Sequence, residues 1–251
     1  VFKIEGGANV FSKHIKDNFS EHHTLYEEVE QKLKKHMEYH IDEIKTSKYE
    51  TSQRKLLGQN GLIYIQRLLM RSRYLLEGII QEVNSKRVLT SYVLLRAHFE
   101  TTGALAYFFD RLNSFYNGNI DFERLDEILF SLSLGSRDKK FKKKNNFIPD
   151  AENVLNMIDR VDKIFDFNEN KKYREAYEHL CEFAHPNFLG TIIGTETNRG
   201  KVKFSKKPKI NENEIGEIIS LLSITLTSFF YIYDKTFSLL NENENIKNII
   251  S

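Results

Sequence analysis

The sequence predicts an all-α protein: a bundle of six to seven helices with one small β-hairpin insert. Apolar residues recur at helical spacing through most of the chain. The 251 residues include only three prolines and twelve glycines, which favours long helices. We expect an N-terminal arm over residues 1–19, a single helical domain over 20–240 with the hairpin insert at about 190–204, and a C-terminal tail over 241–251.

Composition narrows the classes of function. The net charge is +2, so any surface that binds nucleic acid must be local. The single cysteine, Cys181, excludes an internal disulfide framework and suits a reducing cytoplasm. Residues 1–9 lack the apolar segment of a signal peptide. Residues 218–233 are uncharged but shorter than the ~20 residues that span a bilayer. We therefore expect a cytoplasmic protein with no membrane segment.

The spacing of apolar residues in the first half of the domain predicts three long helices. Residues 20–47 are strongly charged and have a narrow apolar stripe, which is typical of a helix with one packed and one solvent-exposed face. A second helix is expected over 51–83, where Gly58 and Gly61 indicate either a close approach of a neighbour or a break. The helix over 85–112 is apolar almost all round, so we expect it to be buried at the centre of the bundle.

Local signals place the later elements. A helix over 121–134 is expected to stop at Gly135, and Pro149-Asp150 is expected to open a helix over 151–165. Helices over 173–185 and 211–240 follow, separated by a hairpin whose turn is Asn198-Arg199-Gly200.

Two basic segments allow two interpretations. Residues 137–144 carry six positive charges and one negative charge, and a second basic group follows the hairpin turn. Such segments are either solvated, mobile loops or local patches that contact phosphates. The candidate nucleic-acid contacts are Lys139, Lys140, Lys142, Lys143, Lys201 and Lys203, with Lys206, Lys207 and Lys209 beside them.

Polar residues within apolar stretches are the first candidates for a site. Arg96 and Glu100 stand four residues apart on the central helix, so their side chains can meet. The pair is either an internal ion pair that fixes helix register or part of a site. His98 projects away from them and is expected to be packed or at the solvent edge.

A helical His–x–x–x–His spacing can place two imidazoles on one metal. His36 and His40 have this spacing, but Met37 stands where zinc proteases carry glutamate. Two histidines alone leave a tetrahedral site incomplete. We therefore expect no metal and no cofactor, and we keep a His36–His40 site only as a weaker alternative.

Two motifs carry a resemblance. LLRAHFE at 94–100 and YEHLCEFAHPN at 177–187, followed by a basic hairpin and a last apolar helix, resemble a family of uncharacterised bacterial helical proteins related to HEPN-like bundles, which include abortive-infection proteins. The resemblance covers roughly residues 53–240. It implies a helical bundle that is often dimeric, and some members cut RNA without a metal.

The resemblance also assigns roles to residues. The HEPN ribonuclease signature, an arginine followed after four to six residues by a histidine, is met by Arg174 and His179, although Glu175 stands where asparagine is often found. His185, at the expected end of its helix before Pro186, is a third catalytic candidate.

Arg96, Glu100 and His185 match recurrent positions of the family, and we expect the three to lie together inside the bundle. Tyr177 and Asn187 are further candidates for substrate binding or for a polar core.

Two functions follow from the residues and the resemblance. The first is a metal-independent endoribonuclease or abortive-infection effector, working as a homodimer on RNA, with a defence-system protein as a further partner. The second is a non-catalytic binding or regulatory module whose polar network is structural.

Overall fold

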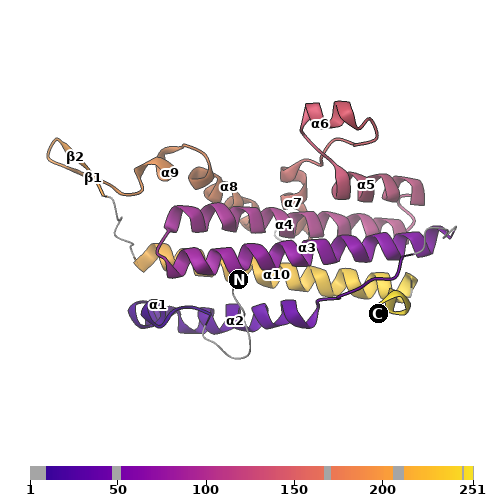
Figure 1. The fold of residues 1–251 in the computed structure, drawn as a ribbon, viewed down its shortest axis with the longest axis horizontal. Coiled ribbons are helices and arrows are strands. Elements are labelled where there is room, and N and C mark those ends of the chain that lie inside the picture. Colours follow the sequence, from indigo (N-terminus) through magenta and orange to yellow (C-terminus); the bar gives the residue numbers. More distant parts are fainter. Residues whose placement is uncertain (1–9, 47–51, 167–170, 206–211, 245, 251) are drawn as a thin grey trace. The chain divides into compact units, whose positions relative to one another are not determined.

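The protein is predominantly helical, as expected. The computed structural model describes residues 10–46, 52–166, 171–205, 212–244 and 246–250. These residues form ten α-helices, two short 3₁₀ helices and one antiparallel pair of strands (Figure 1). With 76% of the chain in helices, the predicted all-α fold with a small hairpin insert is confirmed. The described residues hold more helices than the predicted six to seven, because three short helices form in segments expected to be an arm, a loop and a strand.

The elements have the following bounds. The helices are α1 (Lys13–Asn18), α2 (His23–Glu38), α3 (Gln53–Asn84), α4 (Val88–Tyr116), α5 (Phe122–Leu134), α6 (Lys139–Lys144), α7 (Val154–Ile164), α8 (Lys172–Ala184), α9 (Phe188–Ile192) and α10 (Glu212–Glu244). The 3₁₀ helices are Ser20–His22 and Ile246–Ile249, and the strands are β1 (Thr195–Asn198) and β2 (Lys201–Phe204).

The chain divides into two compact units. Unit 1 comprises Val1–Met37, Arg73–Phe99 and Glu175–Thr227, and unit 2 comprises Glu38–Ser72, Glu100–Arg174 and Ser228–Ser251. Helices α3, α4, α8 and α10 each contribute residues to both. A single domain over 20–240 stays a prediction, and each unit is described by itself.

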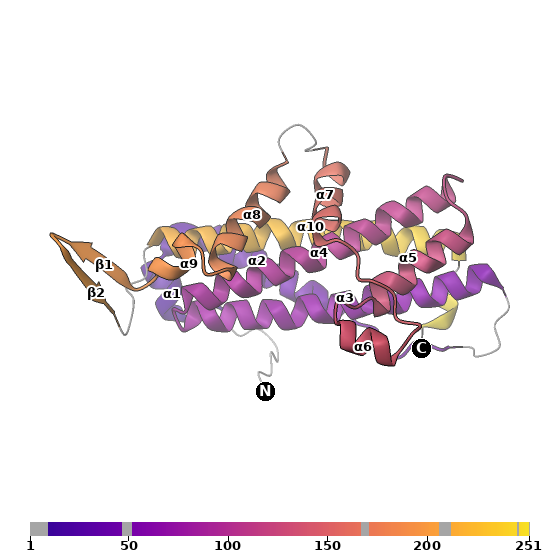
Figure 2. The same ribbon diagram turned by 90° about the horizontal axis from the view of Figure 1, so that it is seen from above.

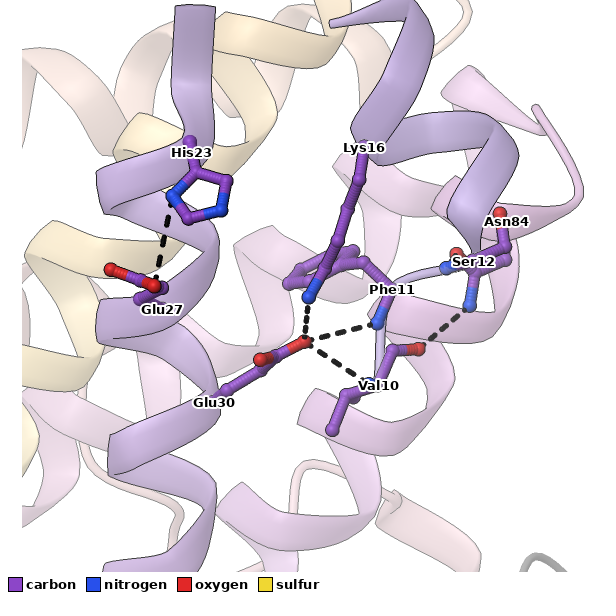
Figure 3. Close-up of polar contacts among 8 residues, drawn as sticks. All are labelled: Val10, Phe11, Ser12, Lys16, His23, Glu27, Glu30 and Asn84. Atoms are coloured by element: carbon purple, nitrogen blue, oxygen red, sulfur yellow. Dashed lines mark hydrogen bonds and ion pairs between the residues drawn. The ribbon is translucent and has the colours of Figure 1, made fainter. Parts of the chain in front are cut away.

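The N-terminal segment is packed into unit 1, so the expected arm over 1–19 is wrong for its described part. Phe11, Ile15 and Phe19 are buried. The Glu30 carboxylate on α2 accepts hydrogen bonds from the backbone N–H groups of Val10 (3.1 Å) and Phe11 (3.5 Å) and pairs with Lys16 at 2.8 Å (Figure 3). The Ser12 N–H donates to Asn84 on α3 at 2.8 Å, and the Asn84 side-chain amide donates to the Val10 carbonyl at 3.0 Å. Short-range periodicity cannot detect such long-range contacts.

Helix α4 provides much of the core of unit 1, although it is not buried on every side. Tyr92, Leu95 and Phe99 are inaccessible or nearly so. Leu89 and Val93, which extend the apolar arc on the sequence, are 38% and 41% exposed. The predicted burial all round α4 is therefore wrong along this edge.

In unit 2, the glycines of α3 permit close approach rather than a break. Helix α3 runs without interruption past Gly58 and Gly61. A Cβ added at Gly58 would lie 2.8 Å from the Cβ of Glu244, and one at Gly61 would lie 3.1 Å from Leu240 and 3.2 Å from Phe108. Of the two interpretations, the close approach is correct.

Helix α10 is the longest and most apolar helix of the last third of the chain. By length and composition, residues 213–244 could cross a membrane, but 67% of the most apolar window is buried inside the protein. This burial is consistent with a core helix. The helix continues to Glu244, and Ile246 beyond it is buried, so the expected tail over 241–251 is packed where it is described.

Local caps define the helices of unit 2 around α6. The Asp121 carboxylate accepts from the backbone N–H of Arg124 and begins α5, which ends before Gly135 as predicted. Helix α7 begins at Val154 rather than at the expected residue 151, because the Asn153 side chain caps it. Figure 2 shows α6 on the connection between α5 and α7.

The predicted hairpin forms in unit 1, shifted toward its turn. β1 and β2 pair in the register Thr195↔Phe204 and Asn198↔Lys201. Arg199 and Gly200 both have positive φ, the conformation that a two-residue hairpin turn requires. Of residues 191–193, expected to be strand, the first two instead end the short helix α9 and Ile193 follows it as the C-cap residue.

Candidate functional site

Helix α8 carries two of the three predicted catalytic residues, Arg174 and His179, and its first turn is fixed by a buried carboxylate of unit 2. Asp162 is 3% exposed and accepts hydrogen bonds from the backbone N–H groups of Tyr173 (2.9 Å) and Arg174 (3.0 Å). The Arg174 guanidinium donates to Asp159 Oδ1 at 2.9 Å. Arg174 is therefore held in an ion pair with α7.

His179 lies in unit 1, in a cluster of aromatic and acidic side chains. Its Nε2 is 2.9 Å from Oε1 of Glu217 on α10. The Tyr92 hydroxyl of α4 donates to the other oxygen of the same carboxylate. The Tyr92 ring stacks on Phe183 with centroids 3.9 Å apart, and the His179 ring meets Phe183 edge-on at 5.2 Å. Glu217 is thus hydrogen-bonded to the Tyr92 phenol, whereas its contact with His179 is a close approach without hydrogen-bond geometry.

The HEPN-type pair does not converge on one face of α8. Five helical steps place His179 about 140° around the axis from Arg174. Arg174 contacts Asp159 within unit 2, and His179 contacts Glu217 within unit 1. The spacing satisfies the signature, and catalytic use of the pair stays a prediction.

Arg96 on α4 contacts Tyr177 on α8 in unit 1. A guanidinium nitrogen donates to the Tyr177 hydroxyl at 3.3 Å, and Cζ lies 5.6 Å from the centre of the ring. Tyr177 is buried, whereas Arg96 and Glu100 are only half-buried. The expected full enclosure of the Arg96 and Glu100 side chains is therefore wrong.

The HPN segment is exposed, so the expected enclosure of His185 inside the bundle is also wrong. His185 and Asn187 both have exposed side chains. His185 follows Tyr177 by eight residues, about 12 Å along a helix, which separates it from the arginine that Tyr177 contacts. Asn187 precedes α9, and its amide donates to Glu182 Oε1 at 3.0 Å.

A pocket of about 310 Å³ opens beside the cluster in unit 1. Apolar and aromatic side chains form most of its wall, with two carboxylates among them. The lining residues are Val88, Tyr92, Phe183, Leu189, Ile192, Ile193, Gly194, Thr195, Glu214 and Glu217. Pockets that combine apolar walls with a few placed polar groups are typical of binding sites.

The electrostatics of the pocket keep Tyr92 a hydrogen-bond donor. Burial raises the pKa of the Tyr92 phenol well above its usual value, and the hydrogen bond and negative charge of Glu217 raise it further. The phenol is therefore protonated at neutral pH.

The sequence analysis did not identify Tyr92 and Glu217 as site residues, because Tyr92 fits an apolar helical arc and Glu217 has the pattern of a surface residue. The available signal was Glu214 with Glu217, three residues apart at the start of an otherwise apolar helix.

The histidine spacing that suggested a metal is not helical in the structure. Helix α2 ends at Glu38, so His40 lies beyond it. His36 is buried with its Nδ1 3.2 Å from the Lys32 carbonyl oxygen, and His40 pairs with Asp42 at 3.1 Å. Among the described residues, no group of three or more His, Cys, Asp or Glu side chains could hold a metal ion.

The predicted basic contacts lie on separate elements. Lys139, Lys140 and Lys143 of α6 are exposed, whereas Lys142 pairs with Asp150. The expected mobile loop is thus partly a helix, because the Asp138 carboxylate accepts from two backbone N–H groups at its start. Lys201 and Lys203 are exposed on β2. Lys206, Lys207 and Lys209 lie outside the described residues.

No protein-family model matches the chain, and no curated protein and no solved structure matches it either. The resemblance to HEPN-like bundles therefore stays a prediction.

Proposed function

We propose that the protein is a helical binding module and that the pocket of unit 1 is its ligand site. The observation that carries the proposal is the grouping of Tyr92, His179 and Glu217 beside a pocket of about 310 Å³ whose lining is part apolar and part polar. Arg174 and Arg96, the other polar candidates, already contact Asp159 and Tyr177. Such engaged groups suit a binding scaffold better than a reacting centre.

The pocket chemistry favours a ligand with an apolar body and a cationic or hydrogen-bond-donating end. Leu189, Ile192 and Ile193 offer an apolar wall, while Glu214 and Glu217 place carboxylates in the same lining. A cation near a carboxylate is stabilised, whereas a phosphate would be repelled. An organic amine therefore fits the pocket better than a nucleotide phosphate.

A matched pair of probes tests this proposal. Phenethylamine and the uncharged 2-phenylethanol would be titrated into labelled protein while amide chemical shifts are recorded. We expect saturable shifts around the pocket with the amine, weaker binding of the alcohol, and at least a fivefold loss of amine affinity in Glu217→Gln. Glu27→Gln, which changes an exposed carboxylate of α2, is the control. Equal binding of both probes by wild type and Glu217→Gln would refute the proposal.

The second candidate is the metal-independent endoribonuclease. It is favoured by one specific observation, the Glu217 carboxylate 2.9 Å from Nε2 of His179, because a catalytic histidine commonly lies beside a carboxylate. Total RNA would be incubated with wild type, His179→Ala and His185→Ala in EDTA. Cleavage that only His179→Ala abolishes supports the enzyme, and RNA left intact by wild type refutes it.

An association into homodimers and a partner protein from a defence system remain part of this second proposal. Light scattering during gel filtration tests the first point. A homodimer gives twice the 29.6 kDa mass of one chain, and a mass of one chain at micromolar concentration contradicts it.

A further inference from the structure

We propose that the loop of residues 136–150 in unit 2, which carries α6 and is called the α6 loop below, binds single-stranded nucleic acid. In this proposal its exposed basic side chains contact phosphates, and Phe141 and Phe147 stack on bases. The proposal is independent of the pocket in unit 1. It goes beyond the lysine pattern, because it depends on a fixed backbone and on aromatic side chains that the structure places in solvent.

The two ends of the α6 loop are joined. The Ser136 N–H donates to the Pro149 carbonyl at 3.1 Å, and the Ser131 hydroxyl donates to the Asp150 carbonyl at 2.7 Å. Gly135 allows this closure, since a Cβ there would lie 2.8 Å from the Cα of Ala151. The base of the loop is therefore closely packed. A ligand that binds to such a loop meets a surface that is already formed, which lowers the entropic cost of binding.

The tip of the loop is also ordered by its own side chains. Asp138 caps α6, and the Asn145 side-chain amide donates to the Phe141 carbonyl at 3.1 Å. Ile148 is buried beyond it and anchors the return of the chain. Figure 1 and Figure 2 both show α6 projecting from the connection between α5 and α7.

The α6 loop carries a positive charge that it does not neutralise itself. It contains six basic and two acidic residues, an excess of four positive charges. Lys142 pairs with Asp150, and among the described residues the other five cations are not seen in ion pairs. Those five are Arg137, Lys139, Lys140, Lys143 and Lys144, all exposed. A chain with a regular spacing of negative charges complements this surface.

Two aromatic rings stand among these cations. Phe141 is 47% exposed and Phe147 is 65% exposed, while the neighbouring Ile148 is 8% exposed. The loop therefore buries an aliphatic side chain and leaves its rings accessible. Exposed rings within a basic surface are the arrangement that stacks on unpaired bases.

The same features disfavour the other polyanionic partners. Bases in a duplex are already stacked on each other and cannot stack on Phe141 or Phe147. An anionic membrane surface binds a long amphipathic helix with a continuous apolar face. Helix α6 has only six residues and one aromatic side chain among five lysines. Single-stranded RNA or DNA fits both the charge and the rings.

Fluorescence anisotropy with a labelled twelve-nucleotide oligouridine tests the proposal on the full chain. If five phosphates are contacted, the affinity should fall roughly 100-fold between 50 and 200 mM salt, from a slope of about −0.7 per phosphate. Phe141→Ala and Phe147→Ala should each weaken binding by about fivefold or more without changing this slope. Lys139→Gln with Lys140→Gln should weaken binding and reduce the slope by about 1.4.

Two controls separate stacking from other causes. Tyr74→Ala removes an exposed aromatic ring from α3 and should bind like wild type. Phe141→Leu keeps an apolar side chain without a ring, so it should behave like Phe141→Ala if stacking is responsible. Because these side chains are exposed, all variants should keep the wild-type unfolding temperature.

Three results would overturn the proposal. The first is no binding of the oligonucleotide by wild type at 50 mM salt. The second is tighter binding to a matched duplex, or to vesicles containing phosphatidylserine, than to the single strand. The third is full binding by Phe141→Leu together with full binding by Phe147→Ala, which would leave only a non-specific charge effect.

Discussion

The burial of His36 in unit 1 predicts a specific loss of stability in mild acid. The side chain is 1% exposed on α2, and Nδ1 lies 3.2 Å from the Lys32 carbonyl oxygen. Burial lowers the pKa of His36 from 6.5 to about 4, the Lys32 hydrogen bond opposes this change, and the Arg73 charge adds to it. The neutral imidazole is therefore the form that fits the folded chain.

The sign and size of the effect follow from linkage. The folded pKa lies below the unfolded one, so the unfolded chain binds the proton more readily, and stability falls as the pH drops from about 6.5 toward 4. At about 1.4 kcal/mol per pKa unit, the full effect is about 3 kcal/mol. About 2 kcal/mol should already be lost at pH 5.

Urea unfolding from pH 7.5 to 4.5 measures this loss. His36→Asn keeps a side-chain N–H near the position of Nδ1 but cannot titrate in this range. Its free energy of unfolding should gain about 2 kcal/mol relative to wild type between pH 7.5 and 5. His14→Asn, which changes an exposed histidine of α1, should follow wild type. A difference in the free energy of unfolding between His36→Asn and wild type that does not change with pH would refute the reasoning.

Three further predictions concern stability, each measured by urea unfolding at pH 7.5. Asp162→Ala should lower the free energy of unfolding by about 2–3 kcal/mol, because it leaves two backbone N–H groups at the start of α8 without their acceptor. Asp159→Ala should lower it by less than about 1 kcal/mol. Similar losses in the two variants would contradict the capping role of Asp162. Arg96→Ala should lower the free energy of unfolding by about 1–2 kcal/mol, the value of a half-buried contact with a tyrosine. A loss above about 3 kcal/mol would instead indicate a fully buried ion pair. Gly61→Ala should lower the free energy of unfolding by about 1–3 kcal/mol through overpacking. Gly78→Ala should raise it by about 0.5–1 kcal/mol, because the added Cβ meets only one flexible leucine methyl, at 3.1 Å. A rise in both variants would exclude overpacking at Gly61.

The candidate pocket illustrates why motif spacing found only part of the site. Arg174 and His179 have the spacing of a known signature, but only His179 reaches the acidic cluster. Its partners are Tyr92, 87 residues earlier, and Glu217, 38 residues later in the sequence. No local pattern contains such separations. The packing of α4, α8 and α10 in unit 1 brings these side chains together.

The sequence by itself determined the elements whose signals are local. The helical period predicted the long helices, Asp121 and Gly135 defined the two ends of α5, and Arg199-Gly200 defined the hairpin turn. Each of these signals lies within three or four residues of the helix end or turn that it determines, so a short stretch of sequence is enough to predict that feature.

Tertiary structure alone decided burial and pairing. Whether His36 is neutral, whether residues 10–19 pack, and whether Arg96 reaches Tyr177 depend on neighbours far away in the chain. The electrostatic cost of burying a charge, and the contact that offsets it, exist only once those neighbours are in place. For that reason, the helices could be predicted from the sequence, whereas the site could not.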